Sequence, residues 1–410
     1  MATAPHIETS RLTGAAPRRR LRIAFVHYRD AAEVGGSLRV EEAIVGALDR
    51  HLFEPHLVFA YGGPGPVAAS TGAECHWLRA AGHGDPAAWL RARALVRRLK
   101  PDLIHYIEPV VWIRAALLGC GIPSLIHVHG VIEESSVRLG TRLLWRALAH
   151  LCTGHVCITE QLRDIVLRLR WAAPARTWVV YNAIDVRRFS ALPPRAHARA
   201  TLGLPPDAFV LGMVCRLVSW KGCLDGIELL ARLPQRFHLL ICGDGPQRPS
   251  LEQAAGRAGV ADRVRFPGAL PDPRAAYAAM DAYLFLSRIE PFGLVLAEAM
   301  AAGVPVIGVA GEGGYREPQR PLLTPENSSL IEGPARREPN APLPPETAAA
   351  LAALIERAAS DPGAMRQRAE AGRLWVTRHF DAPRQAEEIS RLYLALLGFE
   401  APVEQVCAAP

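Results

Sequence analysis

The sequence predicts an α/β protein with two domains, each built on a doubly wound parallel sheet. Three observations support this prediction. The chain has 410 residues, which is enough for two complete hydrophobic cores. Short apolar runs typical of buried strands alternate with helical patterns along most of its length. A connection containing two prolines, residues 191–199, separates a first series of these units from a second.

The overall composition narrows the class of protein. No apolar run reaches membrane-spanning length. The net charge is +7, carried almost entirely by arginine, because lysine occurs only at Lys100 and Lys221. No basic motif with interleaved aromatic residues is present, so we expect no nucleic-acid partner. The eight cysteines show neither disulfide nor zinc spacing, which favours a cytoplasmic protein with reduced thiols.

The first half begins with a unit suited to hold phosphate. Residues 1–20 are polar and unpatterned, and we expect a flexible arm. An apolar strand over residues 22–27 leads to a loop containing Gly35 and Gly36, and then to a helical pattern. Glycine lets the backbone approach a ligand closely, so this turn can cradle an anion. It is not the GxGxxG fingerprint, which argues against a dinucleotide enzyme.

Further strands of the first domain are expected at residues 55–59, 103–107, 124–128, 154–158 and 177–180. His129 directly follows the third of these. Ligands of doubly wound sheets bind at the carboxyl ends of strands, so His129 is well placed to contact one. A structural histidine is an equally good interpretation of the sequence alone.

The second half opens with a strand over residues 209–214, followed by Arg216 and Lys221. Both cations are expected beside a strand end and a helix start. A like-charge pair is unfavourable in such a place unless an anion lies between them, which predicts a site for a phosphate-bearing ligand.

The segment over residues 282–303 is the most informative of the chain. A buried strand over residues 282–286 precedes a turn marked by Pro291 and Gly293, and a helix then runs from Leu294 to Ala302. The free amides at its start favour an anion or a polar ligand. Glu290 lies in the turn, and Glu298 is the only charged residue between Gly293 and Gly308. Burying a carboxylate in so apolar a segment is costly unless it is hydrogen-bonded, so the two glutamates are predicted to hold a polyol. The alternative is a surface helix with one solvated glutamate.

The rest of the chain is predicted from composition and helical periodicity. Residues 318–345 are rich in proline and polar groups and are expected to be irregular. Helical patterns cover residues 347–359, 364–379 and 384–397.

The segment RIEPFGLVLAEAMAAGVPVI, residues 288–307, resembles the E-x7-E element of retaining glycosyltransferases of the GT-B fold, glycosyltransferase family 4. The resemblance extends from about residue 22 to residue 310, and more loosely to residue 398. It implies two Rossmann-like domains facing across a cleft, with these boundaries: arm 1–20, N-terminal domain 21–183, donor domain 184–383, a terminal helix 384–398 that crosses back, and a loose tail 399–410.

The resemblance also implies roles for individual residues. Glu298 would hold the ribose of the donor, and Glu290 would contact the sugar. Amides of Phe292, Gly293 and Leu294 would hold sugar and phosphate oxygens. Arg216 and Lys221 would contact the diphosphate. His129 would contact the sugar, and Gly35 and Gly36 would contact the donor phosphates. The residues Gly313, Gly314 and Glu317 resemble a further family loop, with an altered spacing.

The implied activity is transfer of a sugar from a nucleotide diphosphate sugar to a glycan, lipid-linked or small-molecule acceptor, with retention of configuration. Alternatives are a non-catalytic sugar-nucleotide-binding protein and a GT-B epimerase or phosphorylase. No Asp-x-Asp sequence occurs, so we expect metal-independent transfer without a cofactor. Residues 89–100 and 139–151 mix aromatic, leucine and arginine residues, a pattern that fits peripheral membrane contact or ordinary core-facing helices.

Overall fold

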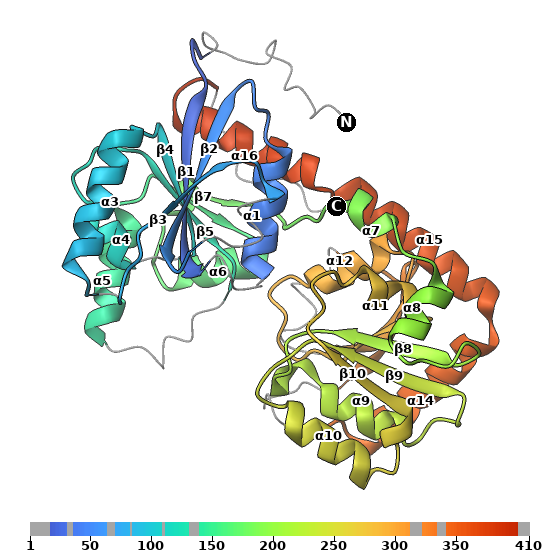
Figure 1. Cartoon of the computed structure of the whole chain (residues 1–410). Helices are drawn as coiled ribbons and strands as arrows, with labels where there is room; N and C mark the ends of the chain where they lie inside the picture. Colours follow the sequence, from blue (N-terminus) through green and yellow to red (C-terminus); the bar gives the residue numbers. More distant parts are fainter. Residues whose placement is uncertain are drawn as a thin grey trace. The chain divides into compact units, whose positions relative to one another are not determined.

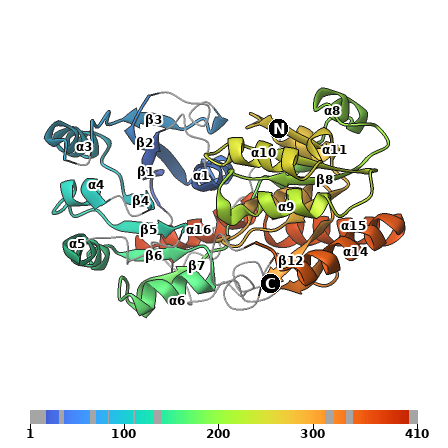
Figure 2. The same cartoon turned by 90° about the horizontal axis from the view of Figure 1, so that it is seen from below.

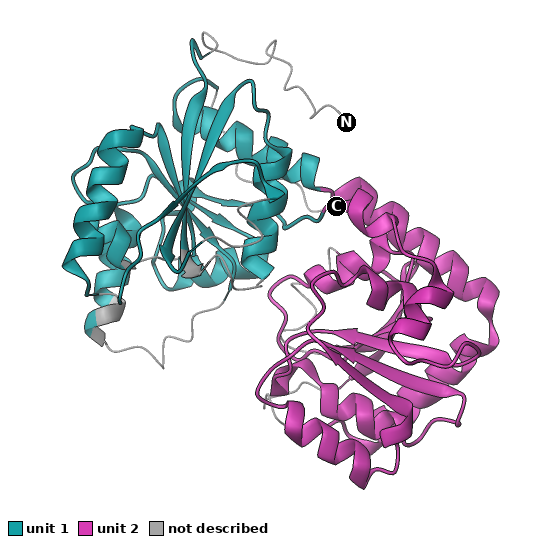
Figure 3. Ribbon diagram, in the orientation of Figure 1, with its two compact units in different colours: residues 1–184, 382–410 teal, residues 185–381 magenta. Residues whose placement is uncertain are grey.

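The computed structural model describes residues 17–30, 36–63, 70–82, 84–108, 111–130, 139–311, 322–333 and 342–400. The chain forms two compact units, which Figure 3 distinguishes by colour. Unit 1 comprises residues 1–184 and 382–410, and unit 2 comprises residues 185–381. Each unit is an α/β layer structure around a parallel sheet, which confirms the predicted fold class.

Unit 1 contains a seven-stranded parallel sheet in the order β3-β2-β1-β4-β5-β6-β7. The strands are β1 (Leu21–Asp30), β2 (Phe53–Tyr61), β3 (Glu74–Trp77), β4 (Leu103–Ile107), β5 (Ser124–Val128), β6 (Gly154–Cys157) and β7 (Thr177–Val179). The chain progresses outward in opposite directions from β1 and β4. Doubly wound sheets bind ligands at the carboxyl ends of strands beside such a reversal.

Helices cover both faces of this sheet (Figures 1 and 2). One face carries α1 (Gly36–Ala47) and α16 (Ala382–Leu396), and the other carries α3 (Pro86–Leu99), α4 (Val111–Ala116) and α5 (Leu139–His150). A further helix, α6 (Glu160–Arg168), starts at the N-cap Thr159, whose side chain accepts a hydrogen bond from the amide of Leu162. The C-terminal helix α16 is anchored to β4, because the Tyr393 hydroxyl lies 2.5 Å from His105 Nδ1.

Unit 2 contains a six-stranded parallel sheet in the order β10-β9-β8-β11-β12-β13. The strands are β8 (Phe209–Val214), β9 (Phe237–Cys242), β10 (Val264–Gly268), β11 (Ala282–Phe285), β12 (Val306–Gly311) and β13 (Ser328–Gly333). Here the order reverses between β8 and β11. β13 lies inside the stretch over residues 318–345 that the sequence predicted to be irregular, and full register with β12 makes it a strand.

The helices of unit 2 also form two layers around their sheet (Figure 1). The first layer is α9 (Cys223–Leu230), α10 (Arg248–Arg257) and α14 (Pro345–Ser360), and the second is α7 (Val186–Ser190), α8 (Arg195–Thr201), α11 (Arg274–Ala279), α12 (Leu294–Ala301) and α15 (Pro362–His379). Fully buried residues such as Leu239, Leu351 and Ile355 tie the first layer to the sheet. Each such side chain contributes about 1.5–3 kcal/mol of burial free energy.

Three observations concern the chain ends and the membrane. Residues 1–16 of the predicted arm lie outside the described residues, whereas Arg19 donates hydrogen bonds to Asp102 at 2.7 and 2.8 Å. Most of the predicted tail, residues 401–410, also lies outside the described residues. Within the described part of the chain, no helix combines the length and apolar character needed to cross a membrane.

Candidate active site

The carboxyl ends of β8 and β11 bring the candidate residues of unit 2 together. Arg216 follows β8 after one residue, and a short 3-10 turn over Ser219–Lys221 comes next. Glu290 lies between the end of β11 and the start of α12. Since β8 and β11 are adjacent and parallel, these two loops emerge side by side at the point where the strand order reverses.

The central contact of this site is an ion pair between Lys221 and Glu290. The ammonium Nζ of Lys221 donates to Glu290 Oε2, across 69 residues of sequence. Only 15% of the lysine side chain and 11% of the glutamate side chain are exposed. The sequence predicted a bound anion beside Lys221. In the structure the carboxylate of Glu290 already lies beside this cation. A polar ligand at this point would meet a positive and a negative group together.

A second, fully buried ion pair fixes the two loops to each other. Arg288 donates to Asp225 Oδ2 at 2.7 Å, and both side chains are at most 5% exposed. Arg288 also binds the turn through its backbone amide, which donates to Trp220 O at 2.6 Å, and through Nη1, which donates to Ser219 O at 2.9 Å. Sequence reasoning missed both residues, although Arg288 stands two positions before Glu290. Breaking such a pair ordinarily costs about 3–5 kcal/mol. The Arg288–Asp225 pair therefore keeps the loops that carry Lys221 and Glu290 in place.

Glycine is required at two positions of this site. Gly222, with φ +73°, is the N-cap of α9, and a Cβ there would lie 2.5 Å from Leu286 O. Gly293, with φ +99°, is the N-cap of α12, and a Cβ there would lie 2.9 Å from Leu296 Cδ1. Larger residues would be strained at both places, and at Gly222 they would also push against the backbone of Leu286.

Among the described residues, no side chain caps the start of α12, so its first backbone amides are available to a ligand. Gly293 offers no capping side chain, and α12 begins at Leu294. The Phe292 side chain is 2% exposed and packs edge-on against Phe380, with ring centroids 5.6 Å apart. The Phe292 side chain therefore has a structural role. The positive end of the α12 dipole faces the loop that contains Glu290.

Glu298 is oriented by a residue that the sequence did not reveal. The buried hydroxyl of Tyr277 donates to Glu298 Oε2 at 2.7 Å. Burial, with the Glu298 carboxylate as the next cause, raises the pKa of Tyr277 well above its ordinary value, so the hydroxyl keeps its proton. Tyr277 lies on α11, which no local spacing links to α12. The hydrogen bond expected for this lone carboxylate is present.

Arg216 differs from Lys221 in its surroundings. Its guanidinium is exposed and has no ion-pair partner among the residues that the structure describes. The five donors of an unpaired guanidinium suit bidentate contact with an anion. Lys221 and Arg216 thus offer one paired and one unpaired positive charge.

In unit 1, His129 lies immediately after the carboxyl end of β5. Both ring nitrogens are buried and have no hydrogen-bond partner in the described part of the chain. Burial lowers the pKa of His129 to about 3, so the imidazole is neutral and retains one donor and one acceptor. Its ring packs on His127 with centroids 4.1 Å apart.

Other buried histidines surround His129 and were not predicted. His105 stacks on His127 at 5.2 Å and meets Tyr393, and burial lowers the pKa of His105 to about 3. His27 Nε2, in β1, lies against the buried carboxyl group of Glu41 of α1. Burial raises the pKa of Glu41 well above its ordinary value. The sequence signal for His105 and His127 was a histidine inside an otherwise apolar strand.

The predicted glycine loop is only partly described. Gly36 is the first residue of α1 rather than part of the loop. Gly35 lies outside the described residues, as do Gly313, Gly314 and Glu317.

Two family models match the chain. The model described as glycosyl transferases group 1 matches residues 194–323, which include all of the unit 2 candidates. The model described as Glycosyltransferase Family 4 matches residues 34–188 in unit 1. The chain belongs to glycosyltransferase family 4. The resemblance inferred from the E-x7-E segment is confirmed, and the chain is a glycosyltransferase that draws on a nucleotide-sugar donor.

Individual relatives agree with this assignment. The glycosyltransferase is 29% identical over 342 residues to the 2-deoxystreptamine glucosyltransferase of Streptomyces kanamyceticus, covering 76% of this chain and 84% of that enzyme. It is 33% identical over 246 residues to the lipopolysaccharide core biosynthesis glycosyltransferase LpsE of Rhizobium meliloti, covering 59% and 64%. The solved structure of Anabaena Alr3699/HepE in complex with UDP and glucose matches with a TM-score of 0.75 at 21% identity, over 91% of this glycosyltransferase and 99% of that chain. This likeness confirms the GT-B fold.

Proposed function

We propose that this glycosyltransferase moves a sugar from a nucleoside diphosphate sugar to an acceptor with retention of anomeric configuration, using the β8–β11 strand ends as the donor site. The observation that supports this most directly is the Lys221–Glu290 ion pair beside the start of α12. A cation next to a carboxylate suits the junction between a diphosphate and a sugar. The cation neutralises phosphate oxygens, and the carboxylate accepts hydrogen bonds from hydroxyls.

The proposed charge stabilisation uses two basic residues in different ways. Negative charge develops on the diphosphate as the bond to the anomeric carbon breaks. The exposed guanidinium of Arg216 would bind phosphate oxygens through two donors, and the compact ammonium of Lys221 would contact them as a point charge. Because Lys221 stays paired with Glu290, it is already positioned before the donor binds.

The sugar and the ribose would be held by groups around α12. Glu290 accepts from sugar hydroxyls, and the amides of Phe292, Gly293 and Leu294 donate to sugar and phosphate oxygens. Glu298, fixed by Tyr277, accepts from the ribose hydroxyls.

As the resemblance implies, we propose that His129 contacts the sugar and that Gly35 and Gly36 contact the donor phosphates. The neutral imidazole of His129 can donate to or accept from a hydroxyl, and both of its nitrogens lack partners within the described residues. We assign no protein base: the departing phosphate oxygen takes the proton of the acceptor hydroxyl as the new glycosidic bond forms.

The test begins with donor identity. A thermal-shift screen against UDP-, GDP-, ADP- and dTDP-sugars should show one nucleotide class that raises the melting temperature, by an amount that grows with the ratio of ligand concentration to Kd. UDP-glucose comes first, since the Anabaena neighbour was solved with UDP and glucose. NMR of the product then shows whether its anomeric configuration is the same as that of the donor sugar. Inversion would contradict the retaining assignment, and a screen without any stabilising sugar nucleotide would contradict the donor site.

We further propose a membrane-borne acceptor, approached through α3 and α5. Exposed apolar residues lie on or next to these helices: Trp89, Leu90, Leu143, Leu144 and Leu151, from 38% to 69% exposed. Arginines accompany them on α3, a combination that suits anionic lipid surfaces. Sedimentation with vesicles of anionic lipid should pull down the wild type and fail for a Leu90→Glu, Leu144→Glu variant. Equal sedimentation of both would contradict this surface.

A further inference from the structure

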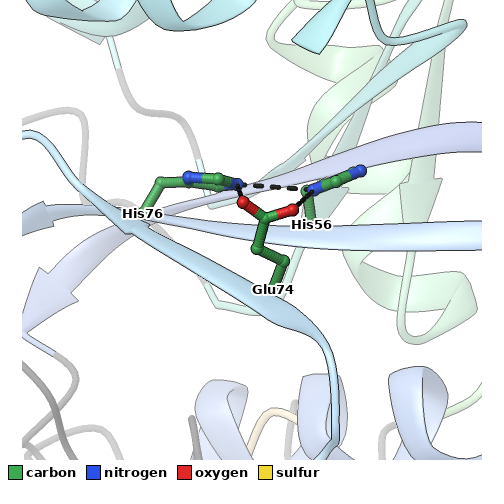
Figure 4. Close-up of side chains that lie close together, drawn as sticks. All are labelled: His56, Glu74 and His76. Atoms are coloured by element: carbon green, nitrogen blue, oxygen red, sulfur yellow. Dashed lines mark hydrogen bonds and ion pairs between the residues drawn. The ribbon is translucent and has the colours of Figure 1, made fainter.

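A cluster of two histidines and a glutamate lies in unit 1 (Figure 4). His56 is in β2, and Glu74 and His76 are in β3. The parallel register pairs His56 with Glu74, and Val58 with His76. Alternation along a strand places Glu74 and His76 on the same face, so all three side chains meet over one edge of the sheet.

The separations between one nitrogen of each histidine and the two carboxylate oxygens of Glu74 fit one small cation. His56 Nδ1 lies 3.4 Å from His76 Nε2 and 3.4 Å from Glu74 Oε2, and His76 Nε2 lies 3.7 Å from Glu74 Oε1. Zinc bonds of about 2.0–2.2 Å in a tetrahedron put neighbouring ligand atoms about 3.3–3.6 Å apart. Figure 4 shows the three groups pointing toward one another.

The kinds of side chain in the cluster also fit a metal. Neutral imidazole and carboxylate are the forms that bind zinc. The Glu74 side chain is 65% exposed, which leaves an approach from solvent and room for a water as fourth ligand.

A second carboxylate lies near the histidine. Glu54 Oε1 lies 3.8 Å from His56 Nε2, the nitrogen that does not face the cluster. Metal-bound histidines usually direct their other nitrogen toward such a carboxylate. Arg22, whose positive charge acts on His56, is itself paired with Glu54 at 3.3 Å.

We propose that His56, Glu74 and His76 form a zinc site that fastens the edge strand β3 to β2. The site lies in the amino half of the sheet, because Glu74 is the first residue of β3, whereas His129 follows the carboxyl end of β5. The role is therefore stabilisation of unit 1 and not transfer chemistry. It does not depend on the proposed donor or acceptor.

The experiment measures zinc binding to the purified full chain after treatment with EDTA. The variants are Glu74→Gln, which changes a mostly exposed side chain, and His76→Gln, which changes a buried one. Matched controls are Glu370→Gln, with a glutamate 51% exposed, and His197→Gln, with an exposed histidine. We expect one Zn²⁺ per chain in the wild type and both controls. Loss of a group that hydrogen-bonds a metal ligand costs about 10–100-fold in metal affinity, so loss of a ligand itself should cost at least about 100-fold.

Two further measurements identify the ligands and the role. Co²⁺ in place of Zn²⁺ should give the visible bands of a four-coordinate nitrogen and oxygen site without thiolate charge-transfer bands. Zn²⁺ should raise the melting temperature of the wild type and the controls while leaving that of Glu74→Gln unchanged. Absence of binding in the wild type, equal binding in Glu74→Gln, or a thiolate spectrum would each overturn the proposal.

Discussion

Replacing Lys221 by arginine tests the proposed charge stabilisation most sharply. Only two of the 47 basic residues are lysine, so arginine serves almost everywhere else in this chain. The Lys221 ammonium lies 15% exposed against Glu290. The longer, planar guanidinium donates through a fixed fork and cannot occupy the same space between Glu290 and a phosphate.

The surrounding backbone cannot move to accept the larger group. Gly222 lies against Leu286, and Arg288 holds the preceding turn through Trp220 and Ser219. We therefore expect Lys221→Arg to keep the fold and the charge but to lose about 10²–10³ in kcat, or roughly 2.7–4 kcal/mol. Lys221→Ala should lose at least as much, because it also leaves Glu290 partly buried without this partner.

The assay measures kcat and the donor KM at saturating acceptor, with circular dichroism as the check on folding. Lys100→Arg is the matched control, since Lys100 is the other lysine and caps the exposed end of α3. It should retain wild-type turnover. If Lys221→Arg turns over within about threefold of wild type, a difference well under 1 kcal/mol, then positive charge alone suffices and the geometric reasoning is wrong.

Three further predictions address the ribose, metal and pH. Glu298→Ala should weaken binding of free nucleoside diphosphate. Tyr277→Phe should weaken this binding about tenfold, since one hydrogen bond to a charged group is worth at least ~1.4 kcal/mol. Unchanged affinity by calorimetry in a folded Glu298→Ala variant would contradict the ribose role. Turnover should survive EDTA at temperatures where the protein stays folded, and complete loss restored by Mg²⁺ or Mn²⁺ would contradict metal-independent transfer. Burial lowers the pKa of His105, His129 and His155 from 6.5 to about 3. Between these values the unfolded chain binds protons that the native protein does not, so the free energy of unfolding should fall on acidification by ~1.4 kcal/mol per pH unit for each histidine. Urea titrations at pH 7, 6 and 5 measure this slope, and a flat profile would refute it.

The sequence determined the fold class and the family because their signals are local. Apolar runs of strand length, separated by helical periodicity, require a parallel sheet with crossover helices. The E-x7-E segment combines a strand, a glycine turn and a helix within about 20 residues. Gly293 could be placed from its neighbours alone, and the structure gives it the positive φ that a helix start of this kind needs.

Tertiary structure alone decided which charged groups meet. Sequence spacing predicted that Lys221 lies beside Arg216. In the structure β8 and β11 are adjacent, and Lys221 forms an ion pair with Glu290. The same long-range pairing joins Arg288 to Asp225 and Tyr277 to Glu298. Periodicity assigns a residue to a face but not to a partner, because the partner depends on which strands become neighbours.

The His56, Glu74 and His76 cluster shows the same limit from the other unit. The spacing of Glu74 and His76 marks one face of a strand only once that strand is known, and β3 has just four residues. Its register against β2 then sets His56 opposite Glu74. Register is fixed by packing over the whole sheet, so a site built across two strands is specified by the sequence but becomes visible only in the folded unit.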